Sequence, residues 1–157
     1  MSLKLRVKDF LDEKHIHYAT MQHPTAYTAQ ELAHMMHISG KLFAKTVVLK
    51  ADGKYVMAVL PATHKVNFNL FKKIVKANNI ELAHEEEFDK LFPQCETGAM
   101  PPLGEMFEME TYVDKTLAED DEIYFNASNH FEAIRMKYKE FEKLTHPIIG
   151  VFGIRNS

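Results

Sequence analysis

Five stretches of the chain have the hydrophobic spacing or the end signals of an α-helix. A capping-box pattern at residues 28–31 (Thr-Ala-Gln-Glu) predicts a helix that begins there and runs to about His37. Asn67 can cap a further helix whose inward positions are Phe68, Phe71, Ile74 and Val75. The remaining helices are predicted around Leu3, Val7, Phe10 and Leu11, which recur at helical spacing, and at Glu85–Phe92 and Tyr138–Leu144.

Segments rich in β-branched and aromatic residues predict strands between these helices. The clearest pair is Phe43–Leu49 and Tyr55–Leu60, joined across Asp52-Gly53, a dipeptide typical of tight hairpin turns. Helices and mostly hairpin-connected strands interleave without a βαβ pattern, so the predicted fold class is α+β. The other predicted strands are His15–His23, Met106–Val113, Glu122–Asn126, Phe131–Met136 and Ile148–Phe152.

The totals are those of an ordinary globular domain. A length of 157 residues fits one domain, residues 1–157, and 46% hydrophobic with 26% charged residues is a typical globular balance. No apolar run approaches the roughly 20 residues that a membrane helix needs. The first six residues have no signal-peptide core, so we expect a cytoplasmic protein. Cys95 is the only cysteine, which excludes an internal disulfide.

The net charge of −3 conceals an uneven distribution along the chain. Residues 1–80 contain 12 Lys and Arg against 5 Asp and Glu, a net +7, whereas residues 81–157 have a net −10. Such a division can place a basic face on an acidic protein, and a basic face attracts a phosphate backbone. Two differently solvated surfaces with no ligand explain the same numbers equally well.

Two segments are candidates for chemistry on their own composition. Lys45 lies inside a predicted strand, where burying an ammonium is costly unless it meets an anion or a carbonyl; a place on the solvent face is the commoner arrangement. Residues 98–104 (Gly-Ala-Met-Pro-Pro-Leu-Gly) form a stiff loop with glycines at both ends. Accessible amides in such a loop can stabilise the oxyanion that forms when an ester is attacked, although a plain connection is also common.

Histidines and the cysteine give weaker signals. His130 directly precedes a predicted strand, where a histidine can position a water, donate to a carbonyl or, most often, cap a turn. His34 and His37 have a spacing that can hold a metal, but no acidic or cysteine partner is identifiable. Cys95 has no defined base. We therefore expect no metal ion and no other cofactor.

The order of three motifs along the chain resembles the YbaK/prolyl-tRNA-synthetase-associated domain family. The motifs are residues 43–49 (Phe-Ala-Lys-Thr-Val-Val-Leu), residues 98–104 and residues 130–132 (His-Phe-Glu), and the similarity extends from the first helix to Leu144. The resemblance implies an α+β fold with a curved or barrel-like mixed β-sheet surrounded by helices. It also implies a trans-editing hydrolase that cleaves the ester of a mischarged tRNA carrying a small amino acid, with alanine on proline tRNA as one candidate.

Site residues follow from this resemblance position by position. Lys45 matches the family's strand lysine, which engages the terminal adenosine, and it is expected to be catalytic together with His130. The family uses no covalent nucleophile; water attacks, in some members assisted by a ribose hydroxyl. The expected substrate-binding residues are Gly98, Ala99, Met100, Pro101, Pro102, Leu103, Gly104, Met21 and Thr46.

Departures from the family pattern bear on specificity. Ala99 stands where many members have a second glycine, and His130 stands where the cysteine-specific branch has aspartate. Met21 lies near that branch's tyrosine, and Thr46 replaces the asparagine of some alanine-specific members. Together these differences argue against the cysteine-specific type without selecting another.

The expected partners are the acceptor end of mischarged tRNA and, as a second option, an aminoacyl-tRNA synthetase; neither a membrane nor DNA is expected. A non-catalytic module that binds tRNA or a synthetase is the alternative function. A metal hydrolase built on the histidine pairs is the third.

Overall fold

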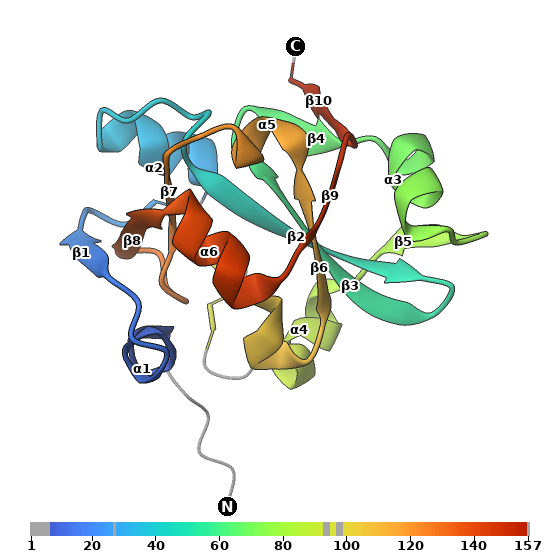
Figure 1. Ribbon diagram of the computed structural model, residues 1–157, viewed down its shortest axis with the longest axis horizontal. Helices are drawn as coiled ribbons and strands as arrows, with labels where there is room; N and C mark the ends of the chain where they lie inside the picture. The colour runs from blue at the N-terminus through green and yellow to red at the C-terminus, as the bar shows by residue number, and fades with distance from the viewer. Residues whose placement is uncertain (1–6, 27, 93–94, 97–98, 157) are drawn as a thin grey trace, which may run out of the picture.

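The computed structural model describes residues 7–26, 28–92, 95–96 and 99–156, which form helices packed around three small sheets (Figure 1). The helices are α1 (Val7–Glu13), α2 (Ala29–Met35), α3 (Phe68–Val75), α4 (Glu85–Leu91), α5 (Lys115–Ala118) and α6 (Tyr138–Thr145), with a 3₁₀ turn η1 (Gly104–Phe107). The strands are β1 (Tyr18–Gln22), β2 (Ala44–Ala51), β3 (Lys54–Pro61), β4 (His64–Val66), β5 (Ile80–Leu82), β6 (Glu110–Asp114), β7 (Glu122–Asn126), β8 (Glu132–Lys137), β9 (Ile148–Gly150) and β10 (Gly153–Arg155).

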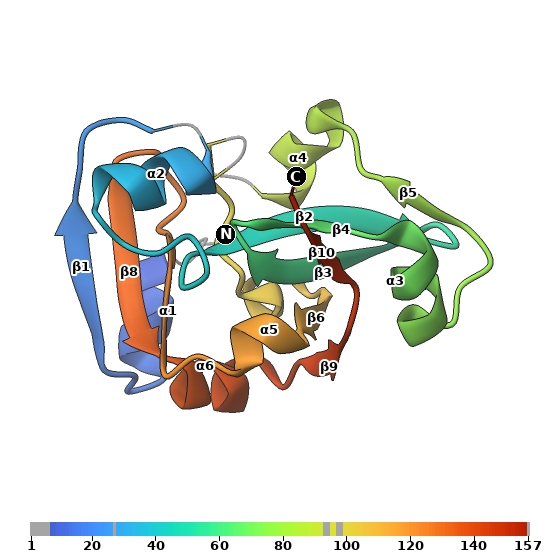
Figure 2. The same ribbon diagram turned by 90° about the horizontal axis from the view of Figure 1, so that it is seen from above.

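A mixed five-stranded sheet is the centre of the molecule. Its order is β5-β2-β3-β6-β9, with β2 antiparallel to both neighbours and with β3, β6 and β9 parallel. An antiparallel sheet of order β1-β8-β7 lies at one end, where β1 and β8 run across the direction of β2 and β3 (Figure 2). The strands β4 and β10 form a third, two-stranded sheet.

The two larger sheets are joined where β2 begins. Phe43 and Tyr124 form a parallel bridge, the Tyr124 amide donates to the Leu42 carbonyl over 3.0 Å, and the two rings stack at 6.5 Å. This junction makes one curved surface from both sheets. The predicted fold class, α+β with a curved or barrel-like mixed sheet surrounded by helices, is confirmed.

Local turn and cap chemistry forms the elements that the sequence predicts. Asp52 and Gly53 both have positive φ, 51° and 85°, as a two-residue hairpin turn requires. At the start of α2, the Thr28 hydroxyl accepts from the Glu31 amide at 3.0 Å. At the start of α3, the Asn67 side chain accepts from the Leu70 amide at 2.9 Å. These three predictions are confirmed.

Several expected boundaries are wrong for identifiable reasons. Helix α2 ends at Met35, because His37 has φ 57° and leaves the helical path. Phe68 is not inward: it occupies the first position of α3 and is 36% exposed, whereas Phe71 is fully buried. The strand predicted at Met106–Val113 begins only at residue 110, because Glu108 has φ 56° and the Met109 amide closes a turn onto the Gly104 carbonyl.

The C-terminal strand predicted at Ile148–Phe152 is instead two strands, β9 and β10. The buried Asp114 carboxylate accepts from the amides of Phe152 and Gly153 at 2.9 and 2.7 Å, which bends the chain between the two strands. The short elements β4, β5, α5 and η1 were not expected from the sequence. None of them exceeds four residues, too short for a hydrophobic period to be visible.

Apolar residues of β2 and β3 divide between the two faces of the central sheet. One face contributes Ala44, Val48 and Met57 to the largest core cluster, which α1, α6 and residues 99–104 complete. The other face contributes Leu49, Ala58 and Leu60 to a cluster closed by Phe71 of α3 and by Phe152. In the described part of the chain, no helix is long and apolar enough to cross a membrane.

Candidate active site

Lys45 lies in β2 opposite Leu60 and is partly buried. Burial lowers the pKa of its ammonium group from the usual lysine value. Among the residues that the structure describes, no carboxylate forms an ion pair with it. A partly desolvated ammonium without a counter-ion can bind an anionic or carbonyl group of a ligand.

The motif loop, residues 98–104, is packed into the core over its described part. Residues 99–104 are all buried; Met100 and Leu103 belong to the same cluster as Ala44 of β2. The Ala99 amide already donates to the Glu96 carbonyl at 3.0 Å, so it is not free to bind an oxyanion. Gly98 lies outside the described residues.

Gly104 has a packing role in this structure. A methyl group built on it would lie 2.1 Å from the Thr111 hydroxyl oxygen and 2.5 Å from the Met109 carbonyl oxygen, far inside contact distance. A residue without a side chain therefore allows η1 to lie against β6. Leu103, fully buried in the core, and the buried Pro101 and Pro102 hold the same segment in place.

His130 is buried between β7 and β8 and is fixed by backbone and side-chain bonds. Its amide donates to the Glu96 carboxylate at 2.7 Å, and its Nδ1 lies 3.0 Å from the Ala26 carbonyl oxygen. Since a carbonyl only accepts, this contact places a proton on Nδ1.

Glu96 connects His130 to the motif loop. Besides accepting from His130, it donates its amide to the Ser128 carbonyl at 2.8 Å and accepts from Ala99 through its own carbonyl. Two of the three sequence motifs therefore meet at one residue. Sequence reasoning missed Glu96, which stands among ordinary loop residues and carries no spacing signal.

Met21 and Lys45 lie on one surface because of strand register. Met21 pairs with Ala133 of β8, and Ala133 pairs with Asn126 of β7, so the three side chains share a face. Phe43 forms an isolated parallel bridge with Tyr124, and Lys45 and Asn126 stand two residues further along their chains, on the same face as these two residues. The strands β2 and β7 are in contact there. We call Met21, Ala133, Asn126 and Lys45 the Met21 row.

Thr46 lies on the opposite face of β2 from Lys45, as the alternation of side chains along a strand requires. It shares that face with Ala44 and Val48 of the large core cluster. Its hydroxyl oxygen is buried and has no hydrogen-bond partner among the described residues. The structure therefore separates Thr46 from the Met21 row.

The other candidates do not assemble into a centre. His34 lies in the last turn of α2 and His37 beyond its end. Over the described ranges, no three His, Cys, Asp or Glu side chains are grouped closely enough to hold a metal ion. Burial raises the pKa of the Cys95 thiol, which disfavours the nucleophilic thiolate.

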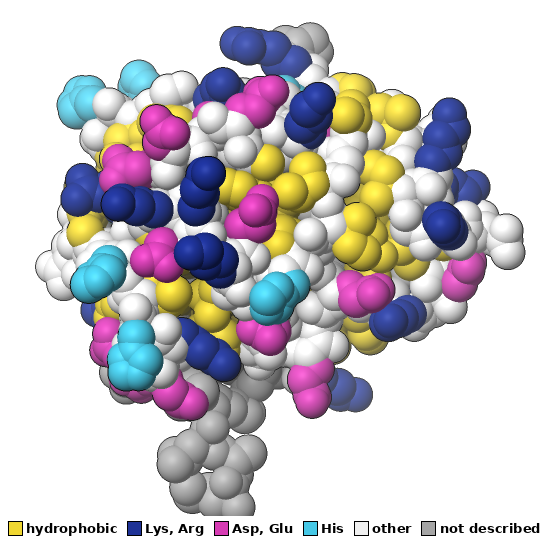
Figure 3. Space-filling view, viewed as in Figure 1, with side chains coloured by type: hydrophobic (Ala, Val, Ile, Leu, Met, Phe, Trp, Pro, Cys, Tyr) yellow, Lys and Arg dark blue, Asp and Glu magenta, His cyan; other side chains and the backbone are white. Residues whose placement is uncertain are grey.

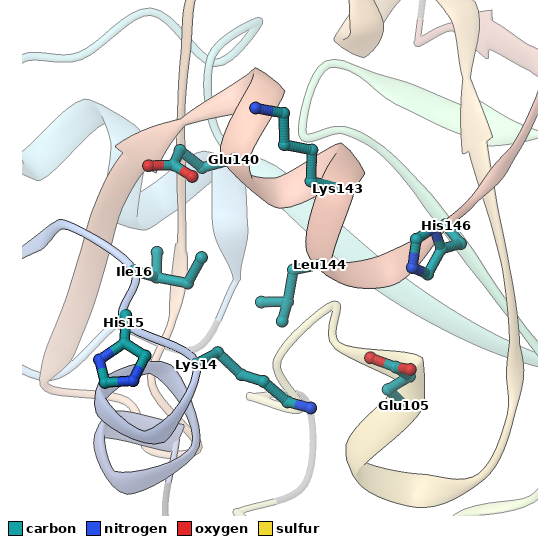
Figure 4. Close-up of a pocket in the computed structure, with 8 residues that line it drawn as sticks. All are labelled: Lys14, His15, Ile16, Glu105, Glu140, Lys143, Leu144 and His146. Atoms are coloured by element: carbon teal, nitrogen blue, oxygen red, sulfur yellow. The ribbon is translucent and has the colours of Figure 1, made fainter.

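A separate groove of about 350 Å³ lies between the end of α1, η1 and α6 (Figure 4). Its walls carry both signs of charge and include neither Lys45 nor His130. The lining residues are Lys14, His15, Ile16, Glu105, Glu140, Lys143, Leu144 and His146.

A basic surface covers α3, β4 and β10. These three elements contain no Asp or Glu, and the basic residues on and next to them are Lys65, Lys72, Lys73, Lys76 and Arg155. Figure 3 shows Lys and Arg side chains on the side of the molecule where α3 lies, whereas both signs of charge mix around α6. Four of these five basic residues come from the positive N-terminal half of the sequence. The strand β4 of this surface follows the end of β3, where Leu60 pairs with Lys45 of β2.

Comparison with known proteins identifies the class of protein that this fold and site define. The sequence model of the aminoacyl-tRNA editing domain family matches residues 23–144, a span that contains Lys45, the motif loop and His130. The chain belongs to this family of editing domains.

The chain is similar in sequence to part of several prolyl-tRNA ligases. The chain is 32% identical over 91 residues to proline–tRNA ligase of Caldicellulosiruptor saccharolyticus and 32% identical over 95 residues to that of Bacillus subtilis. These matches cover 58% and 60% of this chain but only 15% and 16% of the ligases. The fold is also that of a crystal structure described as a candidate trans-editing enzyme for prolyl tRNA synthetase, with TM-score 0.82, 18% identity and coverage of 97% and 96% of the two chains.

Proposed function

We propose that this protein is an aminoacyl-tRNA deacylase that hydrolyses the ester of a mischarged tRNA carrying a small amino acid. Alanine on proline tRNA is the first candidate substrate, since the matched relatives are prolyl-tRNA ligases. The observation that carries the proposal is the partly buried ammonium of Lys45, which pairs with no described carboxylate and lies within the span matched by the editing-domain family.

The reaction needs a bound ester and one water molecule. Water attacks the ester carbonyl, the bond between that carbon and the ribose oxygen breaks, and the ribose oxygen takes a proton to leave tRNA and a free amino acid. Lys45 holds the terminal nucleotide as a cation, which fixes the ester relative to the water. The hydrogen bond from Nδ1 to the Ala26 carbonyl holds the His130 ring in one orientation, in which it can contact a water or take part in proton transfer. Ala99 and Met100 are buried in the segment that Glu96 connects to His130.

Editing explains why a small site is useful. A synthetase pocket that fits proline discriminates weakly against a smaller amino acid, because one methylene is worth only about 1–3 kcal/mol. A second site that accepts the smaller product and excludes the larger correct one restores accuracy. Met21, partly exposed on the Met21 row, is the side chain that we propose limits the size of the amino acid.

The basic surface supplies the electrostatic part of tRNA binding in this proposal. Five cationic side chains, on and next to elements that contain no Asp or Glu, attract a phosphate backbone at long range. We further propose that residues 1–157 act as one domain in the cytoplasm, where tRNA is charged, either alone or beside a synthetase.

A deacylation panel tests the function. Purified protein is mixed with tRNAs charged with alanine, cysteine, serine and proline, and ester loss is followed against buffer alone. We expect hydrolysis of the alanyl ester in preference to the prolyl ester. Lys45→Ala should reduce the rate strongly, and Lys54→Ala, at the exposed start of β3, is the matched control. Binding of tRNA without turnover of any ester would instead support the non-catalytic module.

A further inference from the structure

Asn126 is a buried polar residue that the assigned site leaves unexplained. Its side chain is 8% exposed, and its Oδ1 has no hydrogen-bond partner within the described part of the chain. Leaving a buried acceptor unsatisfied lowers stability, so such a group in a native fold calls for an explanation. An apolar residue at this position of β7 would avoid that cost.

The surroundings of Asn126 have a definite chemical order. Along the Met21 row, two apolar side chains, Met21 and Ala133, lie on one side of the amide, and on its other side β7 contacts β2, the strand that carries the cation Lys45. An aminoacyl-tRNA end has the same order: an apolar amino-acid side chain, then the α-carbon with its ammonium group, then the ester and the anionic nucleotide. With the nucleotide on Lys45 and the side chain against Met21, the α-ammonium comes to the middle of the row.

On this basis we propose that Asn126 is a substrate-binding residue whose Oδ1 accepts a hydrogen bond from the α-ammonium group of the esterified amino acid. The inference rests on the proposed deacylase function and adds a contact to the same site. A neutral amide suits this position better than a carboxylate, which would pair with the neighbouring Lys45 and neutralise it. Because Oδ1 is buried here, binding requires a neighbouring side chain to move.

The test compares two esters that differ only at the α-carbon. Alanyl-tRNA has the α-ammonium, and propionyl-tRNA has a hydrogen atom in its place. For Asn126→Ala we expect kcat/KM on alanyl-tRNA to fall about 10- to 100-fold, the range for a hydrogen bond to a charged group. On propionyl-tRNA the same variant should be within about twofold of the wild type, because that substrate has no ammonium donor.

Controls separate a binding role from a structural one. Asn126→Leu, which keeps the branching and the number of heavy atoms of the side chain, should repeat the substrate-dependent decrease. It should also unfold at or above the wild-type Tm, since it replaces an unsatisfied acceptor by an apolar group. Asn79→Ala, at an exposed asparagine outside the Met21 row, should change neither ester's rate.

An equal decrease on both esters, or no decrease on alanyl-tRNA, would overturn the role of Asn126 while leaving the deacylase proposal intact. A wild-type protein that hydrolyses neither ester would overturn the proposed function first, and the assignment of Asn126 with it.

Discussion

Gly104→Ala is the substitution for which the structure gives the clearest stability prediction. The new methyl group would lie 2.1 Å from the Thr111 hydroxyl oxygen and 2.5 Å from the Met109 carbonyl oxygen. The hydroxyl can rotate away, but the carbonyl belongs to the backbone that enters β6 and cannot. Overpacking a buried site costs about 1–3 kcal/mol, and a backbone clash puts this one near the upper end.

A destabilisation of about 3 kcal/mol should lower the Tm by roughly 6–12 °C in a domain of this size, at about 2–4 °C per kcal/mol. Thermal unfolding followed by circular dichroism, with urea unfolding at 25 °C as a second readout, measures the change. Gly40→Ala is the matched control, because its new methyl group would meet only the end of the Thr63 side chain, at 2.9 Å. Adding Thr111→Ala to Gly104→Ala should restore part of the stability, since the clash with Met109 remains.

A Gly104→Ala protein with the wild-type Tm would refute the packing role assigned to this glycine. Deacylation measured well below the lowered Tm adds a second readout. If Gly104 serves packing alone, folded Gly104→Ala protein should keep most of the wild-type rate. A Gly104→Ala protein that is stable but inactive would instead support a substrate-binding role for Gly104.

Three further predictions concern other parts of the molecule. Asp114→Ala should lower the free energy of unfolding in urea by about 3 kcal/mol, because it leaves the Phe152 and Gly153 amides unsatisfied, whereas Asp114→Asn, which keeps an acceptor, should be less destabilised. Hydrogen bonds from Lys50 and Tyr55 lower the pKa of Glu87 to about 2. The ionised carboxylate therefore stabilises the fold above the ordinary carboxyl pKa, and this contribution disappears as pH falls toward 2. Glu87→Gln should be less stable than the wild type at pH 7 and equal to it near pH 2, and a difference that persists at pH 2 would contradict this. Replacing the lysines at the end of α3 (Lys72, Lys73 and Lys76) by Gln should weaken tRNA binding and reduce its salt dependence. The slope of the logarithm of the binding constant against the logarithm of the salt concentration should become shallower by about 0.9 for each duplex phosphate that is no longer neutralised. An unchanged slope would exclude the basic surface from tRNA binding.

Local chemistry explains which parts of the fold could be predicted from the sequence. The turn at Asp52-Gly53 and the caps at Thr28 and Asn67 are formed by residues a few positions apart, so their signals are visible in a short window. The parallel pairing of β3, β6 and β9 depends on contacts between residues far apart in the chain. The sequence pattern suggested mostly hairpin-connected strands and did not reveal this pairing.

The candidate site divides in the same way. Lys45 and the motif loop could be named because the resemblance to a family assigns roles to particular positions. The packing function of Gly104 depends on Thr111 and Met109, which approach it only in the folded chain. Asn126 had no motif at all, and it becomes a candidate only through strand register and its unsatisfied oxygen.

The deacylase assignment depends most on the rate at which the purified protein releases alanine from proline tRNA charged with alanine, compared between the wild type and Lys45→Ala. We expect hydrolysis well above the buffer rate for the wild type, and a large decrease for the variant at an unchanged Tm. Hydrolysis at the buffer rate by the folded wild-type protein, across this and the other small-amino-acid esters, would contradict it.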